Sequence, residues 1–100
     1  GPIGSITYAA GSGSLPEGSG RTIVRAAEAQ RRFGGTIMVV GHAAKGEGDD
    51  AARQTLASQR AAAVANGLLN LGVQRENIRA GTSNGRVDAS RVDIALQGAR

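Results

Sequence analysis

The chain has 100 residues, which suffices for one compact domain and leaves no room for a second core. It contains no cysteine, and this excludes disulfide bridges, zinc–cysteine sites, thiol nucleophiles and iron–sulfur centres. Twelve basic residues against eight acidic ones give a net charge of +4 and a general attraction for polyanions. One Tyr and one Phe offer nucleic-acid bases little to stack on, so we expect no nucleic-acid partner.

Leu, Ile, Val and Phe together make up 20 residues, so order must come from the pattern of apolar residues rather than from their number. No apolar stretch approaches the ~18–20 residues of a membrane span. Membrane association is therefore expected only through parts of the parent protein outside this sequence. Residues 1–5 are similar to the remnant of a protease-cleaved fusion tag. We expect the domain over residues 6–97 and a short tail over residues 98–100.

The first half of the chain predicts a strand, a helix and a second strand. The apolar segment Ile6–Ala9 is typical of a strand and is followed by a flexible Gly-Ser loop. Ser14 is a candidate N-cap and a proline follows in the first turn, so a helix is expected from Leu15 to Phe33, where two glycines stop it. Thr36–Val40 is continuously apolar, as a central strand covered on more than one side requires.

Spacing along the first helix separates two faces. The face expected against the core carries Ile23, Ala26, Ala27 and Phe33. Another face carries a charged row formed by Arg21, Arg25, Glu28 and Arg32. Such a row is typical of a solvated helix face, and a binding surface is the alternative.

The second half predicts a long helix and two more strands. A loop over residues 41–48 leads to a helix that is capped by Asp49 or Asp50 and ends at Gly72. Its amphipathic stripe is formed by Leu56, Arg60, Ala61, Val64, Leu68 and Leu71. Strands are expected over residues 78–80 and 91–96, the latter with strict alternation. The βαβαββ order predicts an α/β fold of the α+β two-layer type, with two helices packed on one four-stranded mixed sheet.

Arg60 is the residue that the pattern marks as unusual. It lies four residues from both Leu56 and Val64 on the stripe otherwise given to the core, where a guanidinium is costly unless its N–H groups find acceptors. A planar fork of five donors suits a carboxylate ligand. The alternative is internal pairing, with Asp93, Asp88 or a loop carbonyl. The pattern leaves both interpretations open.

His42, the only histidine, directly follows the central strand. With no cysteine, and no carboxylate nearer along the chain than Glu47, it cannot assemble a metal site by itself. No serine has the flanking pattern of an activated nucleophile. The glycine-rich loop lacks a phosphate-binding ending, and Asp49 and Asp50 lack the spacing of a calcium loop. We expect a structural histidine, no metal, no cofactor and no enzymatic activity.

Four motifs carry a resemblance that covers residues 6–96. They are the apolar strand into Gly-His at 37–42, Leu-Ala-Ser-Gln-Arg-Ala-Ala-Ala-Val at 56–64, Leu-Gly-Val at 71–73 and Arg-Val-Asp-Ile at 91–94. The second resembles a Leu-Ser-x-x-Arg-Ala-x-x-Val helix and the fourth an Arg-Arg-Val-Glu-Ile closing strand. Together they resemble the OmpA-like domain family of periplasmic peptidoglycan-binding modules, which also occur in Pal lipoproteins and in MotB.

The resemblance implies a site for the meso-diaminopimelate of the cell-wall stem peptide. In the family, an Asp two residues after Gly-His takes the ligand ammonium, and the helix Arg, here Arg60, takes a carboxylate. The Asp position is Ala44 in this chain, and a family Asn three residues before the helix Leu is Arg53. Glu47, Asp49 or Asp50 are candidate substitutes for the lost acid. The predicted ligand-binding residues are Arg60, His42, Ala43, Ala44, Asp49 and Asp50.

Two functions follow from the resemblance. The first is a non-catalytic peptidoglycan-binding domain of a Gram-negative envelope protein, which recognises the diaminopimelate-containing stem through Arg60. Such a domain is expected in the periplasm, as part of an outer-membrane or envelope-anchored protein. The alternative is a degenerate domain that has lost peptidoglycan binding and serves in protein–protein interaction or oligomerisation, with another envelope protein as its partner.

Overall fold

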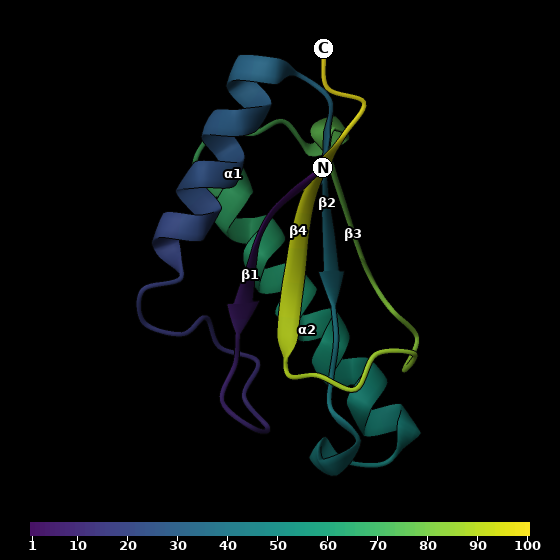
Figure 1. Ribbon diagram of the computed structural model, residues 1–100. Coiled ribbons are helices and arrows are strands. Elements are labelled where there is room, and N and C mark those ends of the chain that lie inside the picture. The colour runs from purple at the N-terminus through teal and green to yellow at the C-terminus, as the bar shows by residue number, and fades with distance from the viewer.

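The computed structural model describes residues 1–100 and shows two layers (Figure 1). One layer is a sheet of four strands, β1 (Pro2–Thr7), β2 (Thr36–Gly41), β3 (Ile78–Thr82) and β4 (Arg91–Gln97). The other layer holds the helices α1 (Gly20–Phe33) and α2 (Asp50–Asn70). Two 3₁₀ turns, η1 (Lys45–Glu47) and η2 (Arg75–Asn77), precede α2 and β3. The predicted fold, two helices on a four-stranded mixed sheet, is confirmed.

The strands lie in the order β1-β4-β2-β3. β4 runs antiparallel to both β1 and β2, whereas β2 and β3 are parallel. Because β1, β2 and β3 run in one direction, the loops that follow them meet at one edge of the sheet, where β4 begins (Figure 1). We call this edge, formed by residues 8–19, 42–49 and 83–90, the loop end of the domain.

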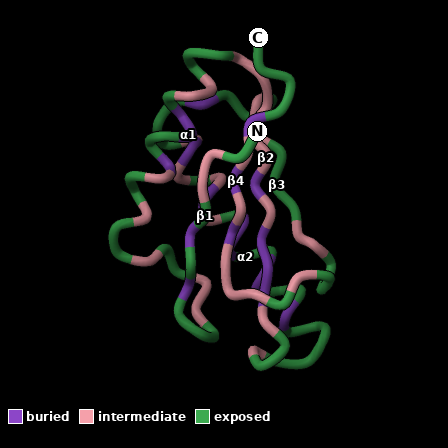
Figure 2. The backbone as a smooth tube through the Cα atoms, in the orientation of Figure 1, coloured by how far each residue is buried: buried purple, intermediate pink, exposed green.

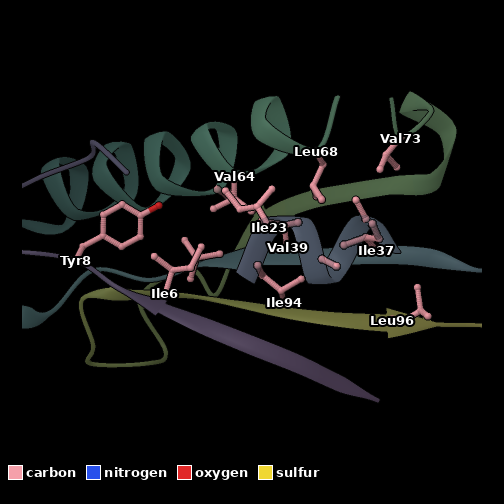
Figure 3. Close-up of a cluster of buried hydrophobic side chains, with 14 residues drawn as sticks. Ile6, Tyr8, Ile23, Ile37, Val39, Val64, Leu68, Val73, Ile94 and Leu96 are labelled. Atoms are coloured by element: carbon pink, nitrogen blue, oxygen red, sulfur yellow. The ribbon is translucent and has the colours of Figure 1, made fainter. Parts of the chain in front are cut away.

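The core lies between the sheet and the two helices. Fourteen buried residues form it, and Ile23 of α1 and Val64 and Leu68 of α2 lie among the inward side chains of β2 and β4 (Figure 3). Burial alternates along both central strands and is lost in most of the loops (Figure 2). A Cβ on Gly41 would lie 2.1 Å from the carbonyl oxygen of Ala57, so only glycine lets α2 approach the end of β2 this closely.

Two elements begin at other positions than the sequence predicts. β1 starts at Pro2 rather than Ile6, so residues compared above to a tag remnant pair with β4. This pairing is made by backbone groups, and the apolar pattern of the side chains gives no indication of it. α1 starts at Gly20 rather than Leu15, because Gly18 has a φ of +86°, outside the right-handed helical region. Ser19, and not Ser14, therefore precedes the helix.

Two apolar residues expected in the core are exposed. Phe33 and Leu71 are each 43% exposed, because each lies at the end of a helix, where the chain turns away. Phe33 packs under Arg32, whose guanidinium carbon lies 5.1 Å from the ring centroid. Val73, two residues beyond Leu71, is buried in the core instead. The charged row of α1 is exposed along its length.

Candidate functional site

Arg60 lies at the centre of the loop end. The core-facing stripe of α2 carries it, and it is 0% exposed. The carboxylate of Glu47, from η1, forms a two-pronged ion pair with the guanidinium, in which Nη1 donates to Oε1 at 2.9 Å and Nη2 donates to Oε2. The Glu47 side chain is only 3% exposed, so solvent screens this pair very little. Of the two interpretations left open by the sequence, the structure shows the internal pairing. The expected loop-carbonyl contacts are present, whereas the carboxylate partner is Glu47 and not Asp93 or Asp88.

The remaining donors of the Arg60 guanidinium bind backbone carbonyls. Nε donates to Ser12 at 2.9 Å, Nη1 donates to His42 at 2.9 Å, and Nη2 donates to Ala9 at 3.3 Å. The buried ring of Tyr8 adds a cation–π contact, with its centroid 5.0 Å from the guanidinium carbon. Burial raises the pKa of Tyr8, and the positive charge of Arg60 opposes this rise. All five N–H groups of Arg60 are thus engaged within the chain.

The Glu47 carboxylate is equally well satisfied. Besides Arg60, its oxygens accept hydrogen bonds of 2.7 Å each from the backbone N–H of Gly11, the backbone N–H of Ala44 and the hydroxyl of Ser90. These bonds hold the pKa of Glu47 far below its usual range, with the Arg60 bond as the main cause and burial acting in the opposite direction. The pair therefore joins three loops and α2, and a ligand reaches Arg60 only if Glu47 leaves.

His42 lies in a chain of side-chain hydrogen bonds that crosses the sheet. Its Nδ1 is 2.8 Å from the hydroxyl of Ser83, and its Nε2 is 2.8 Å from Oδ2 of Asp93. Ser5 donates to Oδ1 of the same Asp93 at 2.7 Å, and so does Arg91 Nε at 2.9 Å. The series Ser5–Asp93–His42–Ser83 follows the spatial order β1, β4, β2, β3, since His42 and Ser83 directly follow the ends of β2 and β3.

Ser83, His42 and Asp93, which are joined by these hydrogen bonds, are the residue types of a nucleophilic triad. His42 is 4% exposed, however, and none of the cavities in the structure is lined by Ser83, His42 or Asp93. Burial raises the pKa of Asp93, but hydrogen bonds from Arg91, Ser5 and His42 outweigh it, and the net change lowers the pKa. The arrangement therefore joins the four strands where they meet the loop end, apart from the three cavities.

A cavity of about 420 Å³ opens at the amino end of α2. It is lined by Ala43, Asp50, Arg53, Gln54, Ala57, Asn84 and Gly85. Arg53 lies in its wall, where Nε and Nη2 donate to the carbonyl of Ala43 at 3.3 and 2.9 Å. Its third nitrogen, Nη1, is 4.0 Å from the nearest oxygen of Asp50, beyond hydrogen-bond distance. The cavity therefore presents a cation and an anion side by side.

The predicted site residues lie at the loop end in different roles. Ala43 and Asp50 line the cavity, whereas the N–H of Ala44 binds Glu47. Asp49 caps α2, as expected, by accepting a hydrogen bond of 2.8 Å from the backbone N–H of Ala52. His42 and Arg60 are enclosed by the contacts described above.

Three roles at the loop end are not predicted from the sequence. Glu47 pairs with Arg60, Arg53 lines the cavity and Ser83 contacts His42. A signal existed for two of them. Glu47 is the only acid in the loop over residues 41–48. Arg53 lies seven residues, or two helical turns, before Arg60, and thus on the same buried face of α2.

No group of three or more His, Asp or Glu side chains is close enough together to hold a metal ion. Neither helix combines the length and the apolar character needed to cross a bilayer.

A comparison with protein families decides the classification. The family model described as the OmpA family matches residues 7–95 of the chain. The chain belongs to the OmpA family. The expected resemblance is thereby confirmed over nearly the whole length. Among curated protein sequences, none matches this OmpA domain.

Solved structures share the fold of the OmpA domain. The peptidoglycan-associated lipoprotein from Burkholderia pseudomallei superimposes with a TM-score of 0.80 at 18% identity, over 93% of this chain and 89% of that one. The OmpA-like domain of FopA1 from Francisella tularensis gives 0.79 at 19% identity, over 96% and 73%. The C-terminal domain of Helicobacter pylori MotB gives 0.75 at 18% identity, over 97% and 84%. At these identities the likeness concerns the fold.

Proposed function

We propose that this OmpA domain is a non-catalytic peptidoglycan-binding module of the bacterial cell envelope, located in the periplasm as part of an outer-membrane or envelope-anchored protein. The observation that carries the proposal is the family match over residues 7–95, and a solved neighbour bears the name peptidoglycan-associated lipoprotein. The polar cavity at the loop end adds a place for a small charged ligand.

The finer form of the proposal concerns the diaminopimelate-containing stem peptide. The resemblance assigns its carboxylate to Arg60, but contact there requires Glu47 to leave the guanidinium. Breaking a buried ion pair costs about 3–5 kcal/mol, and a single charge-assisted hydrogen bond returns only about 1.5–3 kcal/mol. These magnitudes favour Arg60 as part of the framework. We therefore expect the ligand at the neighbouring cavity, which is lined by Ala43 and Asp50.

Pelleting with purified sacculi tests the function. The domain is expected to pellet with diaminopimelate-containing sacculi, and Arg25→Gln, at an exposed position on α1, serves as a control that pellets equally. A domain that stays in the supernatant at low and at physiological salt overturns the proposal. Stronger pelleting of Glu47→Gln than of the wild type would instead assign the ligand to Arg60.

The closed pair also favours a second function. Arg60 has no free donor, and Ala44 stands where the family has its acid, so the domain has features of a module that has lost peptidoglycan binding. Such a module would contact another envelope protein or a second copy of itself. It would not pellet with sacculi, and self-association would raise its mass with concentration in sedimentation. A domain that pellets and stays monomeric at all concentrations excludes this alternative.

A further inference from the structure

We propose that the cavity at the amino end of α2 binds a free α-amino acid group, with the carboxylate on Arg53 and the ammonium on Asp50. The inference rests on the proposed function and specifies its ligand contact. The side chain of diaminopimelate presents such a group, because it carries an ammonium and a carboxylate on one carbon.

Arg53 is a fixed and incompletely satisfied cation in the cavity wall. Its side chain is only 10% exposed, and two hydrogen bonds to the carbonyl of Ala43 hold the plane of its guanidinium. Nη1 finds no hydrogen-bond partner within the chain, since even Asp50 stays 4.0 Å away. A largely buried guanidinium that keeps free N–H groups at a cavity is a receptor for a carboxylate, because charge-assisted hydrogen bonds are stronger than neutral ones and the fixed plane favours a two-pronged contact.

Asp50 supplies the opposite charge one helical turn before Arg53. Its side chain is fully exposed at the rim of the cavity and makes only the loose 4.0 Å ion pair with Arg53, so it can meet an ammonium without breaking a hydrogen bond. The two charges lie close together but are not hydrogen-bonded to each other. This spacing suits a ligand whose own opposite charges are separated by a single carbon.

The remaining walls are polar and shaped by the turn after β3. Gln54 donates to the hydroxyl of Thr82 at 3.0 Å, and this hydroxyl also lies 3.2 Å from the side-chain oxygen of Asn84. Asn84 and Gly85 both have positive φ, 55° and 77°, which turns the chain back over the cavity. A Cβ added to Gly85 would lie 4.0 Å from Nη1 of Arg53, so this turn closes the wall facing the free nitrogen.

The two buried arginines of α2 therefore differ in what they can bind. Arg60 has all five donors engaged, and its counter-charge is Glu47 of the same chain. Arg53 lies on the same helix face and keeps one nitrogen open to a cavity of about 420 Å³. The structure thus offers Arg53 as the free cation for a ligand carboxylate at this end of the domain.

An NMR titration with three related probes tests the assignment. The probes are meso-diaminopimelate, pimelate, which lacks its ammonium groups, and 1,5-diaminopentane, which lacks its carboxylates. We expect the affinities to fall in that order, with shifts at the amides of Gln54, Asn84 and Gly85 and at Nε of Arg53. Binding of diaminopentane as tight as that of diaminopimelate, or shifts confined to Glu47 and Arg60, would overturn the proposal.

Variants separate the contact from the fold. Arg53→Gln is expected to weaken diaminopimelate binding at least about tenfold. Asn84→Asp keeps the Arg53–Ala43 bonds and tolerates the positive φ, but it places a negative charge in the cavity and should weaken binding as well. Arg25→Gln is the control with unchanged affinity. An unchanged affinity in both cavity variants, with native spectra, contradicts the assignment.

Sacculus pelleting distinguishes a failure of this inference from a failure of the proposed function. If wild type and Arg53→Gln pellet equally, the domain binds peptidoglycan and the inference is wrong. If the wild type does not pellet and does not respond to diaminopimelate, both are wrong. Pelleting that is lost only in the two cavity variants supports both.

Discussion

Replacing Glu47 by glutamine tests the buried ion pair at the loop end. Glutamine has nearly the same shape but no charge, so the guanidinium of Arg60, 0% exposed, would be left without a counter-charge. The new amide NH₂ would also face donors, either the N–H of Gly11 or the N–H of Ala44 and the hydroxyl of Ser90. Removing one partner of a buried ion pair costs about 3–5 kcal/mol. We expect a loss of this size in the free energy of unfolding.

Urea and thermal unfolding followed by circular dichroism measure this loss. For a domain of this length, each kcal/mol lost from the free energy of unfolding lowers the melting temperature by about 4–8 °C. The melting temperature of Glu47→Gln should therefore fall by at least about 12 °C. Glu28→Gln, on the exposed face of α1, is the matched control and should change stability by less than about 0.5 kcal/mol. A loss below about 1 kcal/mol in Glu47→Gln would refute the reasoning, because exposed pairs contribute that little.

Three further perturbations have defined outcomes. The folded chain lowers the pKa of Glu47 from its ordinary 4.5, so the unfolded chain binds the proton first as the pH falls. The stability difference between wild type and Glu47→Gln should therefore be full at about pH 6 and shrink towards pH 2 in urea titrations, and a constant difference would contradict this. Asp93→Asn weakens the bonds to its three partners and, given its partial exposure, should cost about 1 kcal/mol; equal melting temperatures would speak against the cross-sheet chain. Gly41→Ala brings a Cβ to 2.1 Å from the carbonyl oxygen of Ala57 and should lower the free energy of unfolding by about 3 kcal/mol or more. An unchanged melting temperature would contradict this, because it would show that α2 moves away from β2 at little cost.

Most of the fold follows from local patterns. The strict alternation in β4 correctly predicts that Val92, Ile94 and Leu96 face the core, because side chains of a strand point to opposite faces in turn. The start of β1 cannot be predicted from such a pattern, since residues 2–5 are held by backbone pairing with β4. The start of α1 does not follow either, because it depends on the backbone conformation of Gly18.

In the candidate site, too, local patterns predict some residues, whereas other contacts depend on the tertiary fold. Arg60 could be recognised because a charge on an apolar helix stripe is a local signal. Its partner could not, because Glu47 lies 13 residues away in a loop whose path over Arg60 depends on the whole loop end. His42 meets Ser83 and Asp93 across 41 and 51 residues, and these contacts follow from the order of strands in the sheet. The spacing of residues along the sequence does not indicate the order of the strands in the sheet.

The bonds around Arg60 act as a cross-link in a chain that has no cysteine. One side chain of α2 fastens the loop after β1, at Ala9 and Ser12, to the loop after β2, at His42 and Glu47. A disulfide bridge also restricts the unfolded chain, whereas these bonds exist only in the folded one. Because no thiol takes part, oxidants and reductants do not affect this cross-link. Protonation of the Glu47 carboxylate at low pH weakens it instead.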